Sequence, residues 1–335
     1  MWVVTLVLAG VVGLMVAAAL FTAVRTARTE ARFPPIGTFA RVGGLRLHYV
    51  DIPADDRQAP VLLFFHGASG NLRDPLFAFR DRFAGRYRLI FVDRPGHGYS
   101  TRGEAPMSAP ATQADVVNEL MRGLGIGRAV VVGHSWGAAV AAAYAVRHGA
   151  DVAGLMLIAP ATHPWPGDVE WYYRVVMRPV IGSLFLNTLV TPVGEWLMRG
   201  AVRSVFTPAA VPSDYIERTG IPLVLRPREF AANAEDVADL NGYVRAFAPR
   251  YAEISAPTVI VSGEKDTVVW PSLHAEVLAR DIAGARIVRI DDTGHMPQFS
   301  HADVVAAALD DLAERSRARQ PAAQQRPPKP AINRN

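Results

Sequence analysis

The chain has 335 residues, of which half are hydrophobic and a fifth are charged, a composition typical of a folded protein with a large core. The net charge is only +4 and no nucleic-acid-binding motif is present, so we expect no nucleic-acid partner. The absence of cysteine excludes disulfides, thiolate metal sites and cysteine nucleophiles.

The N-terminal segment is apolar enough to enter a membrane. Residues 1–24 contain no charged side chain and no proline, and as a helix they would extend about 36 Å, enough to cross a bilayer core of about 30 Å. We predict a transmembrane anchor in the lipid bilayer, with a cleaved signal peptide or a buried core helix as alternatives. Arg25, Arg28 and Arg32 lie in the following linker, residues 25–37. The positive-inside tendency then places the rest of the chain in the cytoplasm, with export as the alternative.

A tight hairpin is expected next. Residues 39–42 and 45–50 have the apolar content of short strands, and Gly43 and Gly44 between them are the signal for a two-residue turn. This pair would add antiparallel strands at one edge of a sheet.

Short runs rich in Val, Ile and Leu then recur along the chain. They occupy residues 61–65, 88–92, 129–132, 154–159, 258–262 and 286–290. Continuous apolar runs are typical of strands covered on both faces, and several of the stretches between them have helical patterns. The sequence therefore predicts an α/β fold with a mostly parallel central sheet and helices on both faces.

An insertion interrupts this regular succession of predicted strands. Residues 162–249 are rich in aromatic side chains and prolines, and we expect a helical cap that divides the core into residues 38–161 and residues 250–314. Most of the aromatic side chains would pack the cap onto the core, and a few would line an apolar pocket. Residues 315–335 are rich in Arg, Pro, Gln and Ala, and we expect a disordered tail there.

The strongest local signal for chemistry is centred on Ser135. An apolar strand runs into Gly133-His134-Ser135-Trp136-Gly137, and an alanine-rich helix follows. A Gly-x-Ser-x-Gly turn between a strand and a helix is typical of a nucleophile elbow, which lifts the serine above the sheet. The start of the helix would also favour negative charge beside the serine.

Several separate motifs agree with this elbow. They are His66-Gly67, the run from Asp93 to Ser100, Gly263-Glu264-Lys265-Asp266, and Gly294-His295-Met296. With these motifs, residues 38–312 resemble the α/β-hydrolase superfamily, and specifically its cap-bearing serine hydrolases of the esterase and lipase type. The resemblance implies an α/β-hydrolase fold with a nucleophile, an acid and a histidine in that chain order.

The catalytic residues that we predict are Ser135, Asp266 and His295. A serine hydroxyl needs a base within hydrogen-bond reach, and the base needs an acid to fix its tautomer. The acid and the histidine each follow a predicted strand, so parallel packing would place all three side chains at the carboxyl edge of the sheet. Three other acidic side chains could orient the histidine instead: Glu264, Asp291 and Asp292.

The resemblance also implies an oxyanion hole made of backbone N–H groups. The candidates are the N–H groups of Trp136, directly after the nucleophile, and of Ala68, in the loop after His66-Gly67. This loop lacks the longer glycine run of one lipase subgroup. We expect His66 and His134 to have structural roles.

These features predict a serine hydrolase that cleaves a carboxylic ester or related acyl substrate through an acyl-enzyme on Ser135, without a cofactor or metal. The apolar cap and the anchor favour a small hydrophobic acyl substrate. Related epoxide hydrolases and haloalkane dehalogenases carry an aspartate at the position of Ser135, so their chemistry is not expected. Three alternatives stay open: carbon–carbon bond hydrolysis, cofactor-free perhydrolysis with the same triad, and a non-catalytic binding role.

Overall fold

The computed structural model describes residues 1–104 and 106–318, and its centre is an eight-stranded sheet in the order β1-β2-β4-β3-β5-β6-β7-β8. The strands are β1 (Thr38–Val42), β2 (Leu45–Ile52), β3 (Val61–Phe65), β4 (Arg88–Val92), β5 (Ala129–His134), β6 (Val152–Ile158), β7 (Thr258–Gly263) and β8 (Arg286–Ile290). From β4 to β8 all neighbouring strands are parallel, whereas β2 is antiparallel to both β1 and β4. The predicted mostly parallel sheet is confirmed.

The hairpin between β1 and β2 forms as its glycines predict. Val42 pairs with Leu45 across a two-residue turn, and Gly43 and Gly44 adopt φ values of 52° and 82°. Both values lie in the left-handed region, which glycine adopts without steric cost. The turn therefore places the antiparallel pair at the edge of the sheet.

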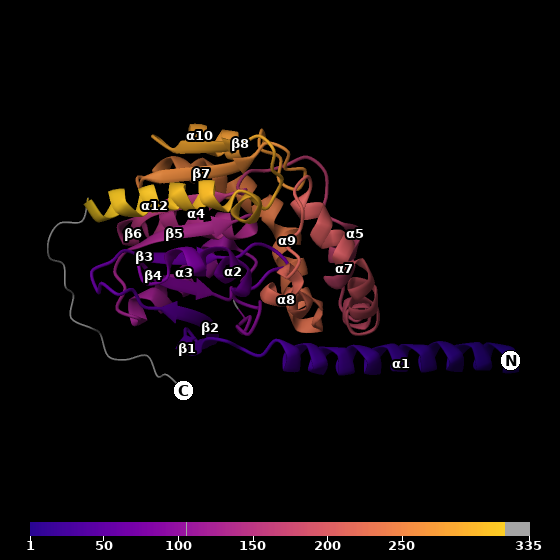
Figure 1. The fold of residues 1–335 in the computed structure, drawn as a ribbon. Coiled ribbons are helices and arrows are strands. Elements are labelled where there is room, and N and C mark those ends of the chain that lie inside the picture. The colour runs from indigo at the N-terminus through magenta and orange to yellow at the C-terminus, as the bar shows by residue number, and fades with distance from the viewer. Residues whose placement is uncertain (105, 319–335) are drawn as a thin grey trace.

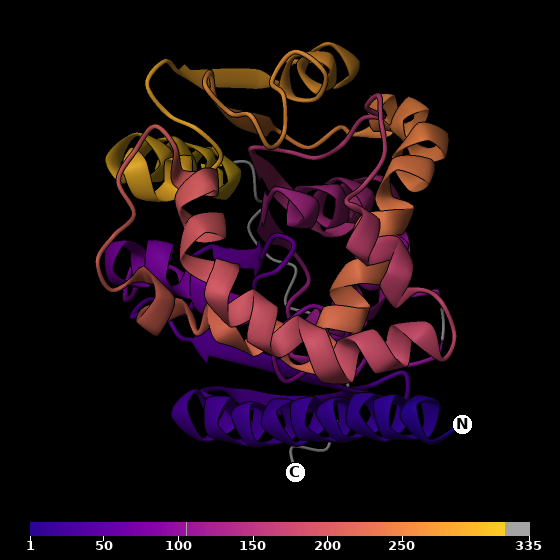
Figure 2. The same cartoon turned by 90° about the vertical axis from the view of Figure 1, so that its right-hand side faces the viewer.

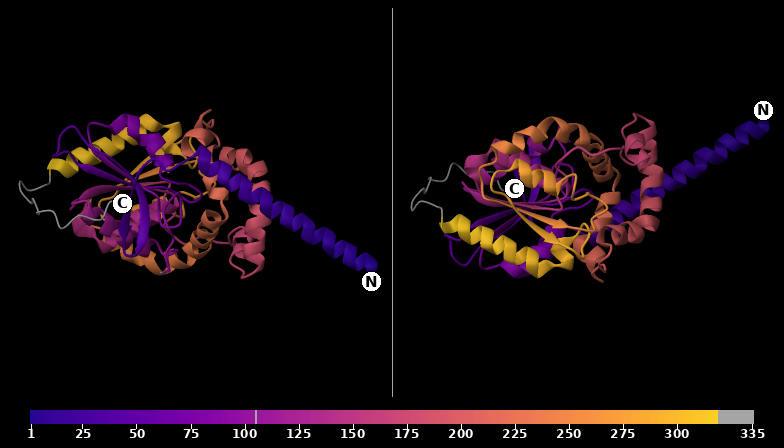
Figure 3. Two further views of the ribbon diagram at one scale, coloured as in Figure 1. Left: turned by 90° about the horizontal axis from the view of Figure 1, so that it is seen from below. Right: turned by 90° about the horizontal axis from the view of Figure 1, so that it is seen from above.

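Helices cover both faces of the sheet (Figure 3). Helices α2 (Arg73–Phe83) and α12 (Ala302–Ala318) pack on one face, and α3 (Pro110–Gly123), α4 (Trp136–Arg147) and α10 (Ala275–Asp281) pack on the other. The short α11 (Pro297–Ser300) precedes α12, and a 3₁₀ turn, Gly149–Asp151, precedes β6. Every residue of β6 is buried, which is why the strand consists of apolar residues and one glycine.

The segment between β6 and β7 forms a helical cap beyond the carboxyl edge of the sheet (Figures 1 and 2). Its elements are α5 (Trp171–Val176), α6 (Ile181–Phe185), a π-helical turn (Leu186–Val190), α7 (Thr191–Phe206), α8 (Tyr215–Thr219), a 3₁₀ turn (Ile221–Leu225), α9 (Pro227–Phe247) and a 3₁₀ turn (Ala248–Glu253). The stretch expected to be helical is thus helical in the structure.

The N-terminal helix α1 (Trp2–Arg32) is long and apolar enough to cross a membrane, by length and composition, and it projects from the body (Figure 1). The predicted linker, residues 25–37, implied that the helix ends near residue 24. In the structure it continues to Arg32. Its charged last turns continue as helix because they pair with the cap: Arg25 lies 2.7 Å from Glu195.

A second contact of α1 involves a buried cation of the cap. Glu30 of α1 lies 3.0 Å from the guanidinium of Arg226. The same guanidinium donates to Glu229 at 2.5 Å and to the carbonyl oxygen of Gly98 in the core. Arg226 therefore joins the N-terminal helix, the cap and the core at one point.

Helix α12 also extends further than the sequence indicates. It continues to Ala318, so residues 315–318 are helical and do not belong to the expected disordered tail. The reason is packing, since the Ser316 hydroxyl is buried and donates to the carbonyl oxygen of Ala153 at 2.9 Å. The rest of the expected tail, residues 319–335, lies outside the described residues.

Candidate active site

The turn between β5 and α4 holds Ser135 in a strained conformation. Its φ of 53° lies in the left-handed region, where a residue other than glycine is uncommon. The turn closes only because its flanking residues are small. A Cβ on Gly137 would collide with the backbone carbonyl oxygens of Phe65 and His66, and a Cβ on Gly133 would collide with that of Gly137. The sharp turn presents the Ser135 side chain at the carboxyl edge of the sheet.

The structure brings Ser135, His295 and Asp266 into one hydrogen-bonded chain. The Ser135 hydroxyl lies 2.9 Å from Nε2 of His295, and Nδ1 of His295 lies 2.7 Å from a carboxylate oxygen of Asp266. A carboxylate only accepts, so Nδ1 carries the proton and Nε2 is free to accept the hydroxyl proton. All three side chains are buried.

Asp266 is held as an ionised carboxylate. Burial alone would raise its pKa, but the facing His295 ring and the N–H groups of Val268 and Val269, at 2.8 and 2.9 Å, lower the pKa below its ordinary value. The other acidic candidates lie elsewhere. Glu264 faces Arg289, Asp292 pairs with Lys265 at 2.5 Å, and Asp291 is exposed.

The predicted oxyanion donors lie beside Ser135. Ala68, Ser135 and Trp136 line the same cavity. Within residues 1–104 and 106–318, neither the Ala68 N–H nor the Trp136 N–H donates to a protein acceptor. Trp136 opens α4, so its N–H belongs to the first turn of a helix, where N–H groups have no partner within the helix. Both groups are free to bind a negative oxygen atom.

The cavity above Ser135 has a volume of about 200 Å³. Its wall comes from the core, from α9 of the cap and from the loop after β7. The other lining residues are Ala161, Trp165, Val237, Leu240, Thr267, Val268, Val269, Trp270 and His274. Most of these side chains are apolar. In the part of the chain that the structure describes, no group of three or more His, Asp or Glu side chains could hold a metal ion.

Comparison with known proteins agrees with this geometry. Residues 62–308 match the family described as alpha/beta hydrolases. The chain belongs to the alpha/beta hydrolase family. A dihydrolipoyllysine-residue acetyltransferase component of the acetoin cleaving system of Cupriavidus necator is 29% identical, over 81% of this chain and 67% of its own. Lipase 3 of a Moraxella species is 28% identical, over 70% of this chain and 71% of its own.

A solved structure of similar shape extends over nearly the whole chain. A membrane phospholipase A, described as a bacterial virulence factor, has a TM-score of 0.66 and 23% identity, and the match covers 94% of this chain and 97% of that one. The family match and the lipases among the relatives confirm the predicted α/β-hydrolase fold and the predicted enzyme class. Lipases among the relatives support ester hydrolysis as the activity of this α/β-hydrolase.

Two further histidines of the hydrolase support its loops. Nε2 of His66 accepts the Arg94 N–H at 3.1 Å, and its Nδ1 lies 2.9 Å from the Gly67 carbonyl oxygen. Nε2 of His134 lies 2.9 Å from the His295 carbonyl oxygen. Burial lowers the pKa of both rings, that of His134 to about 3, so both are neutral near pH 7. These contacts fit the structural role expected for them.

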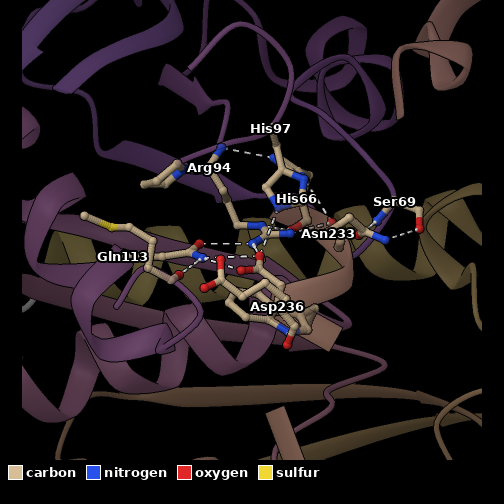
Figure 4. Close-up of polar contacts among 12 residues, drawn as sticks. His66, Ser69, Arg94, His97, Gln113, Asn233 and Asp236 are labelled. Atoms are coloured by element: carbon tan, nitrogen blue, oxygen red, sulfur yellow. Dashed lines mark hydrogen bonds and ion pairs between the residues drawn. The ribbon is translucent and has the colours of Figure 1, made fainter. Parts of the chain in front are cut away.

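We call the loop after β3 that carries the predicted donor Ala68 the oxyanion loop. The buried ion pair behind it is a feature that the sequence did not reveal. Arg94 and Asp236 are fully buried, and their side chains lie 2.6 Å apart. Figure 4 shows the two side chains and their contacts. Arg94 also donates to the carbonyl oxygens of His66 at 3.0 Å and of Gly67 at 3.1 Å. The pair therefore fixes the peptide planes that precede Ala68.

The same network ties the cap to the elbow. The Asp236 side chain accepts from His97 at 2.9 Å, and its backbone carbonyl accepts the indole N–H of Trp136 at 3.0 Å. Asn233, one turn earlier in α9, accepts the Ser69 N–H at 2.6 Å (Figure 4). The only signal in the sequence was Arg94 within a tight turn-forming run, and nothing local marked its partner in the cap.

A buried carboxyl group lies close to the triad. The hydroxyl of Tyr215, in α8, donates to Asp74, in α2, at 2.8 Å. Burial raises the pKa of Asp74 to about 6, although the Tyr215 hydrogen bond and the charge of His295 oppose the shift. Asp74 therefore loses its proton at a higher pH than an exposed aspartate does.

Proposed function

We propose that this hydrolase cleaves carboxylic esters through an acyl-enzyme on Ser135. The observation that carries the proposal is the chain of hydrogen bonds from Ser135 through His295 to Asp266, next to two free backbone N–H groups. An ester hydrolase needs an activated nucleophile, a general base and donors for the oxyanion, and these groups supply each of them.

The proposed reaction has two halves. Oγ of Ser135 attacks the ester carbonyl carbon while Nε2 of His295 takes the hydroxyl proton. The Ala68 and Trp136 N–H groups stabilise the oxyanion. The carbonyl re-forms, and the alcohol leaves with the proton from His295. Water then attacks the acyl-enzyme with His295 as base, which releases the carboxylic acid and restores Ser135.

The cavity favours a hydrophobic acyl group. Its lining is mostly apolar, and about 200 Å³ is small for a binding pocket, so a short or narrow acyl chain fits best. The lipases among the relatives agree with a hydrophobic ester. Carbon–carbon bond hydrolysis and perhydrolysis would use the same side chains, and no contact in the cavity favours either.

We also propose that residues 1–24 anchor the enzyme in a lipid bilayer and that the catalytic body lies in the cytoplasm. The apolar span and the arginines that follow it, Arg25, Arg28 and Arg32, support this orientation. Protease protection of the body in sealed membrane vesicles distinguishes it from export.

The activity test uses the full-length protein in detergent micelles. We expect a fluorophosphonate probe to label Ser135, found by peptide mass analysis, and p-nitrophenyl acetate to be hydrolysed. In Ser135→Ala both signals should be lost, with kcat/KM lower by at least ~10³-fold, because the nucleophile and its base act as a unit. A series of longer p-nitrophenyl esters then measures the acyl length that the cavity accepts.

Ser204→Ala is the matched control, since Ser204 is an exposed serine of α7 and should leave labelling and turnover unchanged. A folded wild-type protein that is neither labelled nor active on these esters contradicts the proposal. Turnover of esters that survives in Ser135→Ala would also reject the acyl-enzyme.

A further inference from the structure

The cap carries an unusual concentration of exposed apolar side chains. We call the following residues the cap face: Trp171, Met177, Val180, Ile181, Leu184, Leu189, Val193, Trp196 and Leu197. Outside residues 1–36, only three other large apolar side chains of the described chain are exposed, at Val268, Trp270 and Val304. Single exposed apolar residues are ordinary, whereas their concentration within residues 171–197 indicates an interaction surface.

Part of the cap face lies on elements that pack against α1. Helix α1 packs against the π-helical turn Leu186–Val190 and against α7. Thr22 is the buried residue of α1. The cap face residues of these two elements are Leu189, Val193, Trp196 and Leu197. These four residues therefore connect the cap face to the apolar helix α1.

One ion pair sets the depth of α7 relative to the span. Arg25 is the first charged residue after residues 1–24, so it lies at the headgroup level when those residues cross the bilayer. Its partner Glu195, at 2.7 Å, lies at the same level. Trp196 is the next residue of α7 and is 81% exposed, which is where interfacial tryptophans occur.

The direction of α1 agrees with this depth. In Figures 1 and 3, α5 and α7 form the part of the body that is farthest from the sheet, and the N-terminal half of α1 projects outward past them. A bilayer that contains this half of α1 therefore lies next to α5 and α7.

Charge on the same segment also suits a lipid surface. Residues 171–206 contain four arginines, Arg174, Arg178, Arg199 and Arg203, and one acidic residue, Glu195, which gives a net charge of +3. All four arginines are exposed. Basic groups near the membrane attract anionic headgroups by about 1 kcal/mol each.

From these observations we propose that the cap face inserts into the interfacial layer of the lipid bilayer beside α1. The enzyme then contacts the membrane with two elements, a spanning helix and the outer helices of its cap. This contact goes beyond the proposed ester hydrolysis and does not depend on it.

The test uses single cysteines, because the natural chain has none to compete for a label. Ile181→Cys and Trp196→Cys probe the cap face, Leu8→Cys probes the span, and Ala150→Cys, exposed near the start of β6, probes the opposite edge of the sheet. Each full-length variant carries the polarity-sensitive dye NBD and is reconstituted into phosphatidylcholine and phosphatidylglycerol vesicles. Some vesicles contain a lipid with a nitroxide near its headgroup.

We expect the dye at residues 181 and 196 to emit at shorter wavelength and to lose at least half of its intensity to the nitroxide lipid. The dye at residue 150 should show neither effect. Quenching at residue 8 alone would show that the cap stands clear of the bilayer, and quenching at none of the sites would show that the chain is not inserted. Either result overturns the proposal.

A blue-shifted dye at residues 181 and 196 without quenching by lipid would place a second copy of the chain on the cap face, which also rejects the lipid contact. The fluorescence readout requires no turnover. The same measurement in the Ser135→Ala background therefore tests the lipid contact separately from the proposed activity. The melting temperature of each variant in micelles verifies that it is folded.

Discussion

The elbow and the outer cap are built on opposite principles. Around Ser135 the backbone is so tightly packed that a single methyl group at Gly137 would displace the oxyanion loop, and a buried ion pair holds that loop from behind. The outer helices of the cap instead leave large apolar side chains exposed. Close packing fixes the conformation of the turn around Ser135. The exposed apolar side chains of the outer cap need a partner surface to cover them.

Among variants that keep Ser135, Asp266 and His295, the largest expected effect on turnover comes from Gly137→Ala. The new Cβ would collide with the carbonyl oxygens of Phe65 and His66, which are backbone atoms and cannot rotate away. The oxyanion loop must shift, and a misplacement of about 1 Å costs about 10²-fold in rate. We expect ester turnover to fall by about 100-fold or more, together with about 1–3 kcal/mol of unfolding free energy.

Gly200→Ala is the matched control in the cap. Gly200 lies inside α7, and a Cβ there would meet no heavy atom of the described chain within 4 Å. Turnover should not change, and the variant should gain about 0.5–1 kcal/mol of stability because alanine favours the helix. Normal turnover by a folded Gly137→Ala would show that the elbow is less constrained than its packing indicates.

The second effect concerns the buried pair of Arg94 and Asp236. Asp236→Asn leaves the guanidinium of Arg94 buried without its counter-charge, and breaking such a pair costs about 3–5 kcal/mol. We expect this loss in denaturant unfolding, and slower fluorophosphonate labelling because Arg94 positions the loop before Ala68. Glu235→Gln, at a more exposed neighbour that pairs with Arg102, should cost about 1 kcal/mol or less. Equal losses of unfolding free energy in Asp236→Asn and Glu235→Gln would show that Asp236 is not needed as the counter-charge of Arg94.

The smallest effect is a pH dependence at Asp74. Its pKa of about 6 in the folded enzyme exceeds the unfolded value of about 3.9, so the stability it contributes is present below pH 4 and lost as the pH rises through 6. Asp74→Asn removes this dependence. In urea unfolding, the unfolding free energy of the variant minus that of the wild type should rise by up to about 3 kcal/mol between pH 4 and pH 7.5.

Asp81→Asn removes a carboxylate from an exposed position of the same helix α2 and is the control for this measurement. A difference between Asp74→Asn and the wild type that does not change with pH would contradict the raised pKa of Asp74.

The parts of the molecule that the sequence predicted are those specified by local pattern. Strands such as β6 were predicted because burial on both faces requires an apolar run, and the turn at Gly43 and Gly44 because both positions need positive φ. Ser135, Asp266 and His295 could be proposed as a set because each follows a strand, and parallel strands end at one edge.

The parts that the sequence did not predict depend on contacts between distant residues. Asp236 is separated by 142 residues from Arg94, and an aspartate in an amphipathic helix looks like an ordinary surface residue. The end of α1 was placed too early for the same reason. Its charged turns looked like a linker. They remain helical because three of their side chains pair with the cap: Arg25 with Glu195, Glu30 with Arg226 and Arg32 with Glu217.

The position of Arg226 has a practical consequence. Its guanidinium is shared by Glu30 of α1, Glu229 of the cap and the Gly98 carbonyl of the core. A fragment that starts after Arg32 would keep Ser135, Asp266 and His295 but lose Glu30, one of the two acidic partners of this cation. Cleavage between α1 and the cap would therefore remove the contacts of Glu30 with Arg226 and of Arg25 with Glu195.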